Sequence, residues 1–305
     1  MRLRNFATGA GGRCFRFEAE EALAFARAMQ LEFRAVSDFG LKATAEVLAR
    51  GFADYFVPIA STEATLWAMA RGDSVDFAAS RVAVRAGEPV GVALIARRGW
   101  TSRLAGMALV PAARRQGVGR ALVEQVIAEA RGRGDRQLEL EVIEQNEPAV
   151  RLYEATGFQR RRRLVGFAGR AGPADPENRA ADLREVDGRL VAARLAAAQP
   201  ADWPWQLSAE TIAQLTPPHV AFEQAGAWVV LTNPAAAPVT VRALVTESGG
   251  WADGRAERLL RAVAARYPDR DFRIGALWPE EVSAVFGSVG WARQSLSQWQ
   301  MGLAL

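Results

Sequence analysis

The sequence predicts an α/β protein built from two halves with a similar order of strands and helices. In residues 31–168, segments with the apolar pattern of strands alternate with segments whose apolar residues recur at helical spacing. A run rich in glycine and proline follows at 169–176, which is typical of a boundary between domains. With 305 residues, 50% of them hydrophobic, the chain is long enough for two domains.

Local signals place the elements of the first half in order. Ser37 and Asp38 are good caps for a helix that ends near Gly51, and Ser61 and Thr62 begin a second helix. Gly87 and the glutamate after it separate two strand patterns, which predicts a hairpin. The full set is a strand at 31–36, helices at 37–51 and after 62, strands at 81–86, 89–97 and 104–110, a helix at 116–132, a strand at 137–143, a helix at 147–156 and a strand at 158–167.

The most informative segment is the basic turn, residues 112–120, between an apolar strand and a long amphipathic helix. The first amides of a helix lack internal partners and carry partial positive charge, so they bind phosphate. Gly117 and Gly119 would let a ligand approach the backbone, while Arg115 and Arg120 add charge. The turn is not a P-loop, because no Gly-Lys-Ser/Thr follows, and Leu122 replaces the third glycine of a dinucleotide fingerprint.

Two motifs in sequence order carry a family resemblance. The first is Arg-x-x-Gly-x-Gly at 114–119. The second is the strand Leu-Glu-Val at 140–142, followed by Asn-x-x-Ala-x-x-Leu-Tyr-x-x-x-Gly-Phe at 146–158. Together they resemble the core of the GNAT superfamily of N-acetyltransferases, from about residue 32 to 168. The resemblance implies a mostly antiparallel central sheet with flanking helices and acetyl-CoA as co-substrate.

The resemblance also assigns functional residues. The residues expected to bind acetyl-CoA are Met107, Ala108, Leu109, Arg114, Arg115, Gln116, Gly117, Val118, Gly119, Arg120 and Asn146. The backbone of 107–109 would contact the pantetheine arm where neighbouring strands splay. Tyr153 would be the general acid, because a phenol with a reference pKa of about 10 can protonate a departing thiolate of about 8.5.

The general base has several candidates. Glu141 precedes Tyr153 in the Leu-Glu-Val strand, a placement similar to the catalytic glutamate of some ribosomal-protein N-terminal acetyltransferases. Alternation puts Glu139 and Glu141 on one face of the strand. Glu144 and a water chain are the alternatives. Tyr55, Phe56 and Trp100 fall in loops that border the acceptor site in such folds.

Composition excludes other chemistries. One cysteine, Cys14, and one histidine, His219, argue against disulfides, a Cys/His metal site or a Ser-His-Asp triad, so no metal is expected. Residues 1–170 carry 26 Lys and Arg against 19 Asp and Glu, a net +7, but these charges are scattered rather than arranged to read nucleic acid. Arg160 to Arg163 form the one basic run and are expected at a solvated strand edge. No apolar stretch reaches membrane-spanning length, so a cytoplasmic location is expected.

The second half reads as a diverged copy of the first. Strands at 227–233 and 239–246, a helix at 252–266, a strand at 272–277 and a helix at 280–286 repeat the order. Acidic residues and Trp251 replace the arginines of the basic turn, and Phe286 stands where Tyr153 stands in the first copy. The sequence therefore predicts an extension at 1–31, a catalytic domain at 32–170, a linker at 171–178 and a degenerate GNAT-like domain at 179–305.

The expected activity is acetyl transfer from acetyl-CoA to a primary amine. The acceptor is a small molecule or a peptide, because acceptor loops of this family carry no portable code. Neither nucleic acid nor a membrane is expected as a partner, and the sequence is compatible with a homodimer. The alternative function is a non-catalytic acyl-CoA-binding regulatory protein, which would need the basic turn but not Tyr153.

Overall fold

The computed structural model of the chain describes residues 31–170, 183–198, 202–247, 251 and 253–305. The first half contains β1 (Leu31–Ala35), α2 (Val36–Phe39), α3 (Leu41–Gly51), α4 (Glu63–Asp73), β2 (Val75–Arg85), β3 (Glu88–Arg98), β4 (Thr101–Leu109), α5 (Val118–Arg133), β5 (Gln137–Ile143), α6 (Glu147–Ala155) and β6 (Gln159–Arg170). The second half contains β7 (Arg184–Val186), α7 (Gly188–Ala198), α8 (Ala209–Ala213), β8 (Val220–Gln224), β9 (Ala227–Leu231), β10 (Val239–Thr246), α9 (Arg255–Arg266), β11 (Asp271–Pro279), α10 (Ala284–Ser288) and β12 (Ala292–Ala304).

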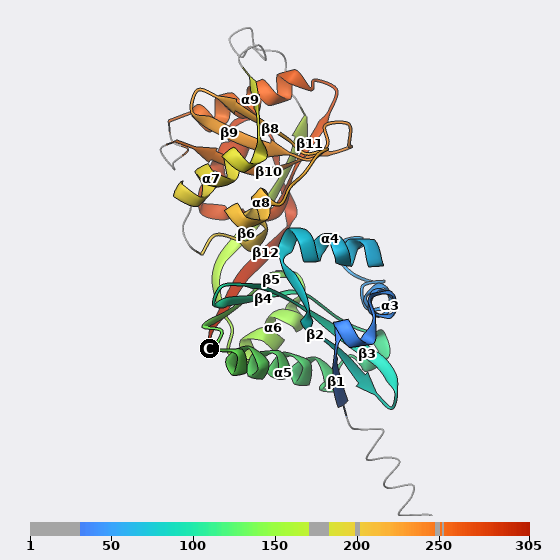
Figure 1. The fold of residues 1–305 in the computed structure, drawn as a ribbon. Helices are drawn as coiled ribbons and strands as arrows, with labels where there is room; N and C mark the ends of the chain where they lie inside the picture. Colours follow the sequence, from blue (N-terminus) through green and yellow to red (C-terminus); the bar gives the residue numbers. More distant parts are fainter. Residues whose placement is uncertain (1–30, 171–182, 199–201, 248–250, 252) are drawn as a thin grey trace, which may run out of the picture.

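The strands form one twelve-stranded sheet in the order β1-β2-β3-β4-β5-β12-β6-β11-β10-β9-β8-β7 (Figure 1). In the described part of the chain, β4 with β5 and β10 with β11 are the parallel pairs, and the other neighbouring strands run antiparallel. In the lower half of Figure 1, α4 lies above the strands and α5 below them. The predicted α/β class and mostly antiparallel sheet are confirmed.

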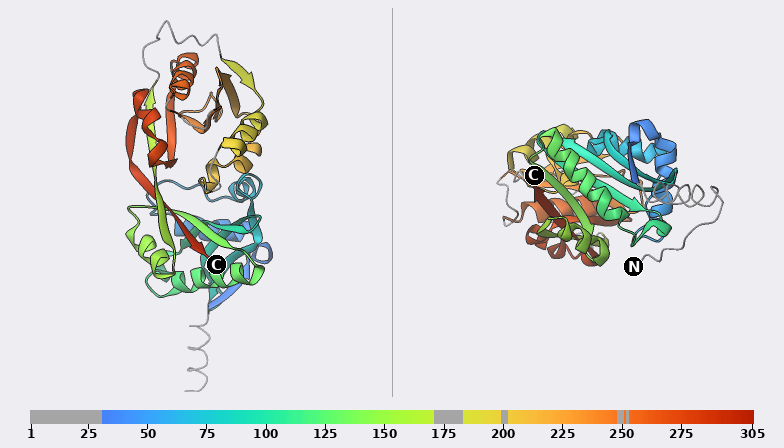
Figure 2. Two further views of the ribbon diagram at one scale, coloured as in Figure 1. Left: turned by 90° about the vertical axis from the view of Figure 1, so that its left-hand side faces the viewer. Right: turned by 90° about the horizontal axis from the view of Figure 1, so that it is seen from below.

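The two halves share two strands. From Gln298 to Ala304, β12 pairs with β5, and its other edge pairs with β6. The second part of β6, from Leu164 to Arg170, pairs with β11 of the second half. Figure 2 shows β12 in red running down from the second half into the first. Each half is therefore completed by a strand from the other, where the sequence had suggested one separate sheet per half.

A glycine divides the first expected helix. Gly40 has a φ of +99°, outside the helical region, so α2 ends at Phe39 and α3 begins at Leu41. Ser37 and Asp38 consequently lie inside α2 and do not cap a longer helix. The start of α4 is as predicted: Thr62 Oγ1 accepts the Thr65 N–H at 3.1 Å, and Thr65 Oγ1 accepts the Thr62 N–H at 2.8 Å.

The second half also contributes to the hydrophobic core of the first. Trp205 is 5% exposed and packs in the first half's core, and its indole Nε1 donates to the Asp73 carbonyl at 2.8 Å. The Arg98 guanidinium lies 4.2 Å from the Trp205 ring centroid and donates to Ser208 Oγ at 2.8 Å and Thr211 Oγ1 at 2.7 Å. The two halves are therefore fixed to one another by side chains as well as by shared strands.

Candidate functional site

Strands β4 and β5 separate in the middle of the sheet. Their parallel pairing runs from Thr101 with Gln137 to Leu104 with Leu140 and then stops. Strand β4 continues to Leu109 with β3 on its other edge, after an irregularity in register beside Leu104. Among the described residues, the β5-facing edge of Met107, Ala108 and Leu109 therefore has no strand partner. This opening agrees with the splayed strands expected there.

The basic turn presents backbone amides at the end of this opening. A 3₁₀ helix, η1 (Pro111–Ala113), is followed by two residues with positive φ, Arg115 at 59° and Gly117 at 79°. Such turns direct successive N–H groups toward one side and form concavities that bind anions. Because the N-cap of α5 is Gly117, the first helical turn receives no side-chain cap from that residue. The turn keeps amide donors available for an anion.

The side chains of the basic turn differ in their contacts. Arg115 and Arg120 are exposed, and Arg120 Nε donates to Glu124 at 2.8 Å within the same helix. Gln116 instead stabilises the turn by two hydrogen bonds: its Nε2 donates to the Ala112 carbonyl at 2.7 Å, and its Oε1 accepts from Arg85 at 2.6 Å. Arg114 points away from the turn to Asp54. Arg115 and Arg120 are thus the arginines of the turn whose side chains are exposed.

The two glycines of the basic turn have different functions. A Cβ added to Gly117 would meet no atom within 4 Å, so this position is open. A Cβ on Gly119 would lie 3.2 Å from Leu109 Cδ1, 3.4 Å from Leu152 Cδ2 and 3.5 Å from Met107 Cε. Gly119 therefore allows α5 to pack closely on β4 and α6. Its neighbour Val118 is buried at 1% exposure and packs in the core.

Tyr153 lies at the opening between the strands. Its hydroxyl points to Met107 Sδ at 3.9 Å, and its ring meets Phe158 edge-on with centroids 5.8 Å apart. Burial, and to a lesser extent the nearby Tyr55, raises the pKa of the Tyr153 phenol above its usual value. The phenol consequently keeps its proton throughout the neutral and moderately alkaline range.

Asn146 connects two elements at the same opening. It is the N-cap of α6, and its Oδ1 accepts the Ala149 N–H at 3.4 Å. Its side chain also lies near enough to Tyr55 to lower the pKa of that phenol, but burial acts more strongly and raises this pKa above its usual value. The structure thus brings Tyr55, Asn146, Tyr153 and Met107 together. Phe56 and Trp100 are exposed, at 51% and 62%.

Glu141 forms a buried ion pair that the sequence did not predict. Its Oε2 accepts from Arg103 Nε at 2.6 Å and Nη2 at 2.5 Å, and the two side chains are only 4% and 5% exposed. A role for Glu141 as a base would therefore compete with this ion pair. Arg103 interrupts an apolar strand pattern, but the parallel register that sets it against β5 is not visible in the sequence.

The neighbouring glutamates are also paired with arginines. Glu139 Oε1 accepts from Arg161 Nη1 at 2.6 Å; burial raises the pKa of Glu139, and Arg161 opposes this effect. For Glu144 burial acts to raise the pKa, but hydrogen bonds from Ser297 and Arg163 outweigh it and lower the pKa below its usual value. Two arginines of the basic run, Arg161 and Arg163, thus neutralise the carboxylates of Glu139 and Glu144.

Replacing Glu141 with glutamine should destabilise the protein. Glu141→Gln leaves the Arg103 charge buried without its partner, and breaking a buried pair in this way costs about 3–5 kcal/mol. Thermal unfolding should show a clear drop in melting temperature. Glu147→Gln is the matched control, because its pair with Arg151 is exposed at 73% and 66% and contributes little. Equal melting temperatures for the two variants would contradict the assignment of a buried pair.

Comparison with known proteins identifies the family. Residues 45–158 match the model of the acetyltransferase (GNAT) family. This segment belongs to the GNAT family. No curated protein sequence matches the chain.

Solved structures share the GNAT fold over most of the chain. A putative acetyltransferase from Pyrococcus horikoshii aligns over 90% of this chain and 89% of its own, with a TM-score of 0.62 and 14% identity. A GCN5-related N-acetyltransferase from Sphaerobacter thermophilus aligns over 90% of this chain and 95% of its own, with a TM-score of 0.64 and 16% identity. A tandem GNAT protein from the clavulanic acid biosynthesis pathway aligns over 90% of this chain and 98% of its own, with a TM-score of 0.59 and 18% identity. The chain therefore has a tandem GNAT fold.

At the positions that the structure describes, the second half differs from the candidate site of the first. Its counterpart of Tyr153, Phe286, is fully buried and packs against Trp278 and Trp251 at ring-centroid distances of 5.2 and 6.0 Å. Glu247 and Asp253 both pair with Arg255 near the start of α9. Residues 248–250 and 252 of the counterpart turn lie outside the described residues. Aromatic rings and carboxylates thus occupy positions where the first copy offers a phenol and arginines.

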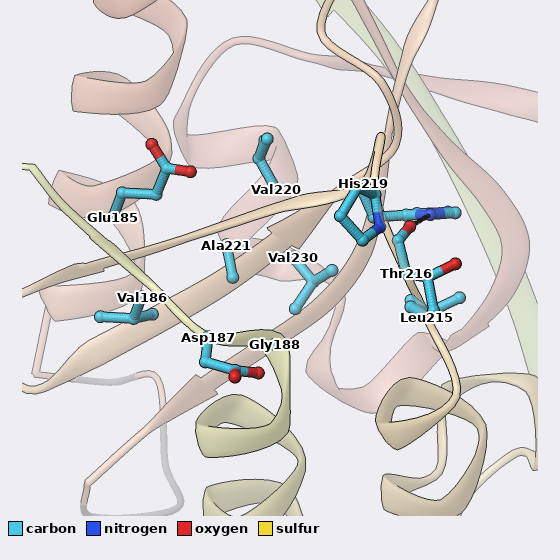
Figure 3. A pocket seen from close by; sticks show the side chains of 11 residues that line it. Glu185, Val186, Asp187, Gly188, Leu215, Thr216, His219, Val220, Ala221 and Val230 are labelled. Atoms are coloured by element: carbon cyan, nitrogen blue, oxygen red, sulfur yellow. Dashed lines mark hydrogen bonds between the residues drawn. The ribbon is translucent and has the colours of Figure 1, made fainter.

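A hollow of about 230 Å³ in the second copy lies apart from these residues (Figure 3). It is formed by β7, the start of α7, the segment before β8, and parts of β8 and β9, with Glu185, Asp187 and His219 among its lining side chains. None of the predicted site residues lines it. In the described ranges no helix is long and apolar enough to cross a bilayer, and no group of three or more His, Cys, Asp or Glu side chains could hold a metal ion.

Proposed function

We propose that the protein is an acyl-CoA-dependent N-acyltransferase, with acetyl-CoA as donor and a primary amine of a small molecule or peptide as acceptor. The observation that carries the proposal is the meeting of three features at one opening. These are the unpaired edge of β4 at 107–109, the open amides that begin α5, and the protonated phenol of Tyr153. The division into a catalytic first domain and a degenerate second domain is part of the same proposal.

The residues present fit an acyl-CoA molecule. Such a molecule supplies an activated thioester and an anionic diphosphate. The amides of Gly117, Val118 and Gly119 would hold the diphosphate, with Arg115 and Arg120 adding charge. The backbone of 107–109 would bind the pantetheine arm, and Asn146 would orient α6 by its cap.

Tyr153 would act as the general acid. It holds a proton on its phenol oxygen beside Met107, in a buried place where the neutral form is favoured. It would give this proton to the leaving sulfur as the amine attacks the carbonyl. Removal of the amine proton is assigned to Glu141, Glu144 or a water chain. Because arginines hold both carboxylates, a direct base has to compete with Arg103 or Arg163.

Titration and turnover test this proposal together. Calorimetry with acetyl-CoA should saturate near one equivalent per chain, because the second copy presents Phe286 and acidic groups in place of the phenol and arginines. Free-thiol release from acetyl-CoA should then rise with one member of a panel of amines and amino-terminal peptides. Binding without thiol release for any amine would favour the regulatory alternative. Two equivalents per chain would contradict a degenerate second copy.

A further inference from the structure

The contacts of Arg114 are unlike those of a phosphate-binding arginine. Its Nη1 and Nη2 form a bidentate pair with Asp54 Oδ2 and Oδ1, at 2.6 and 2.7 Å. Nη2 also donates to the Gly51 carbonyl at 2.9 Å, and Nε donates to the Leu109 carbonyl at 3.3 Å. A guanidinium has five N–H groups, and these four bonds direct most of them to the protein. Arg114 thus joins the basic turn to the end of α3 and to β4.

The end of α3 is in direct contact with the strand that forms the opening. A Cβ at Gly51 would lie 2.7 Å from Ala108 Cβ and 3.3 Å from the backbone N and O of Leu109. A glycine is required for this close approach. The chain leaves this junction as the aromatic loop, residues 52–58, so the position of the loop is set by Gly51 and by the Arg114–Asp54 pair.

Tyr55 follows Asp54 directly and reaches the catalytic opening. Its N–H donates to the Phe52 carbonyl at 3.1 Å, and its ring packs edge-on against Phe52 and Phe56 at centroid distances of 5.0 and 5.5 Å. It lies near enough to Asn146 and Tyr153 for the Asn146 side chain to influence the Tyr55 phenol and for Tyr55 to influence the Tyr153 phenol. Tyr55 therefore spans from the aromatic loop to α6, the helix that carries the proposed acid.

We propose that Tyr55 contacts the substrate beside Tyr153, and that Arg114 is a positioning residue that holds Tyr55 there through Asp54. The identity of the substrate rests on the proposed transferase function. The placement of Tyr55 by Arg114 rests on the observed contacts and is independent of that function. The basic turn then has two tasks divided among its arginines. Arg115 and Arg120 meet the anion, and Arg114 orders the acceptor side.

Asp54→Asn separates the two readings of Arg114. A phosphate-binding Arg114 would be freed by this change, so acetyl-CoA affinity and turnover would be kept or improved. If Arg114 instead positions Tyr55, Asp54→Asn would weaken that positioning, because the Arg114 guanidinium would lose its carboxylate partner. We expect Asp54→Asn, Arg114→Gln and Tyr55→Phe each to lower kcat by about 10-fold to 100-fold, the loss typical of a displaced contact, while the Kd for acetyl-CoA stays within about 3-fold. The double variant of Arg114 and Asp54 should be no worse than either single one.

Arg120→Gln is the control for phosphate binding. It should weaken acetyl-CoA binding with little effect on kcat. The opposite pattern, with Arg114→Gln weakening acetyl-CoA binding and Asp54→Asn unchanged, would overturn the positioning proposal. If Tyr55→Phe had the wild-type kcat and acceptor KM, Tyr55 would not contact the substrate. Melting temperatures should stay near wild type, because the Arg114–Asp54 pair is 37% and 61% exposed.

A tyrosine titration keeps the placement testable even if the protein binds no acyl-CoA. The chain has three tyrosines, so ring ¹³C signals can be assigned by single Phe variants. In the wild type, the pKa of Tyr55 should exceed the usual value because the ring is partly buried. In Asp54→Asn it should fall toward about 10, the value of a solvated phenol. An unchanged Tyr55 titration would overturn the positioning by Arg114, whereas failure of acetyl-CoA to bind the wild type would overturn only the proposed function.

Discussion

Removing residues 297–305 is expected to unfold the first half of the protein, although these residues come last in the chain. They form the part of β12 that pairs with β5 on one edge and β6 on the other. Met301 is fully buried, and Trp299, Leu303 and Leu305 pack against the first core. Complete burial of one large apolar side chain contributes about 1.5–3 kcal/mol, and of these four Met301 is completely buried while the others are partly buried. Loss of these side chains together with the strand pairing on both edges removes a large part of the stability of a typical domain, about 5–15 kcal/mol.

The measurement is thermal unfolding and near-UV circular dichroism of a chain ending at Leu296. We expect loss of the cooperative transition of the first half and loss of acetyl-CoA binding. Gln294→Ala, on the exposed part of the same strand, is the control and should leave both unchanged. Supplying residues 292–305 as a peptide should partly restore the fold. A truncated chain that melts and binds like the wild type would show that β12 is dispensable for the first half.

Local patterns were sufficient to predict several elements. The strand at 137–143 coincides with β5, and the strand at 239–246 coincides with β10, because each is a short segment in which apolar and polar residues largely alternate between clear breaks. The short elements β7, α8 and β8 were missed, since segments of three to five residues carry too little periodicity. The predicted linker at 171–178 and residues 1–30 of the predicted extension at 1–31 lie outside the described residues.

The final strand illustrates what local patterns omit. Trp299, Met301, Leu303 and Leu305 alternate with more polar or smaller residues, so a strand could have been read from period-two spacing. The strands with which it pairs could not be predicted in this way. Sequence order favours pairing with the preceding β11, whereas the structure inserts β12 between β5 and β6, more than a hundred residues upstream.

The proximity of the candidate site residues could be predicted from the sequence in outline, but their side-chain contacts could not. The motif placed Tyr153, the basic turn and β4 at one opening, because the backbone geometry of a strand, a turn and a helix start follows local sequence. The partners of Arg114 and Glu141 depend on long-range contacts with Asp54 and Arg103. A charged residue in a motif can therefore be read as a ligand of substrate when its neighbour in space is another part of the protein.

Tyr153→Phe is expected to lower turnover by about 100-fold to 10,000-fold, the usual loss when proton-transfer assistance is removed. The variant loses one hydroxyl, whose contact in the structure is the long one to Met107 Sδ, so folding and acetyl-CoA affinity should persist. Because burial raises the pKa of this phenol above its ordinary value of about 10, the wild-type rate should show no loss from Tyr153 ionisation between about pH 7 and 10.

Steady-state kinetics across this pH range, with calorimetry for acetyl-CoA, measure both effects. Tyr267→Phe is the matched control, because Tyr267 belongs to the second half at the C-cap of α9. It should behave like the wild type. If Tyr153→Phe turned over at the wild-type rate, the leaving sulfur would have to be protonated by another group, and Tyr55, the phenol nearest in the same opening, would be the next residue to replace.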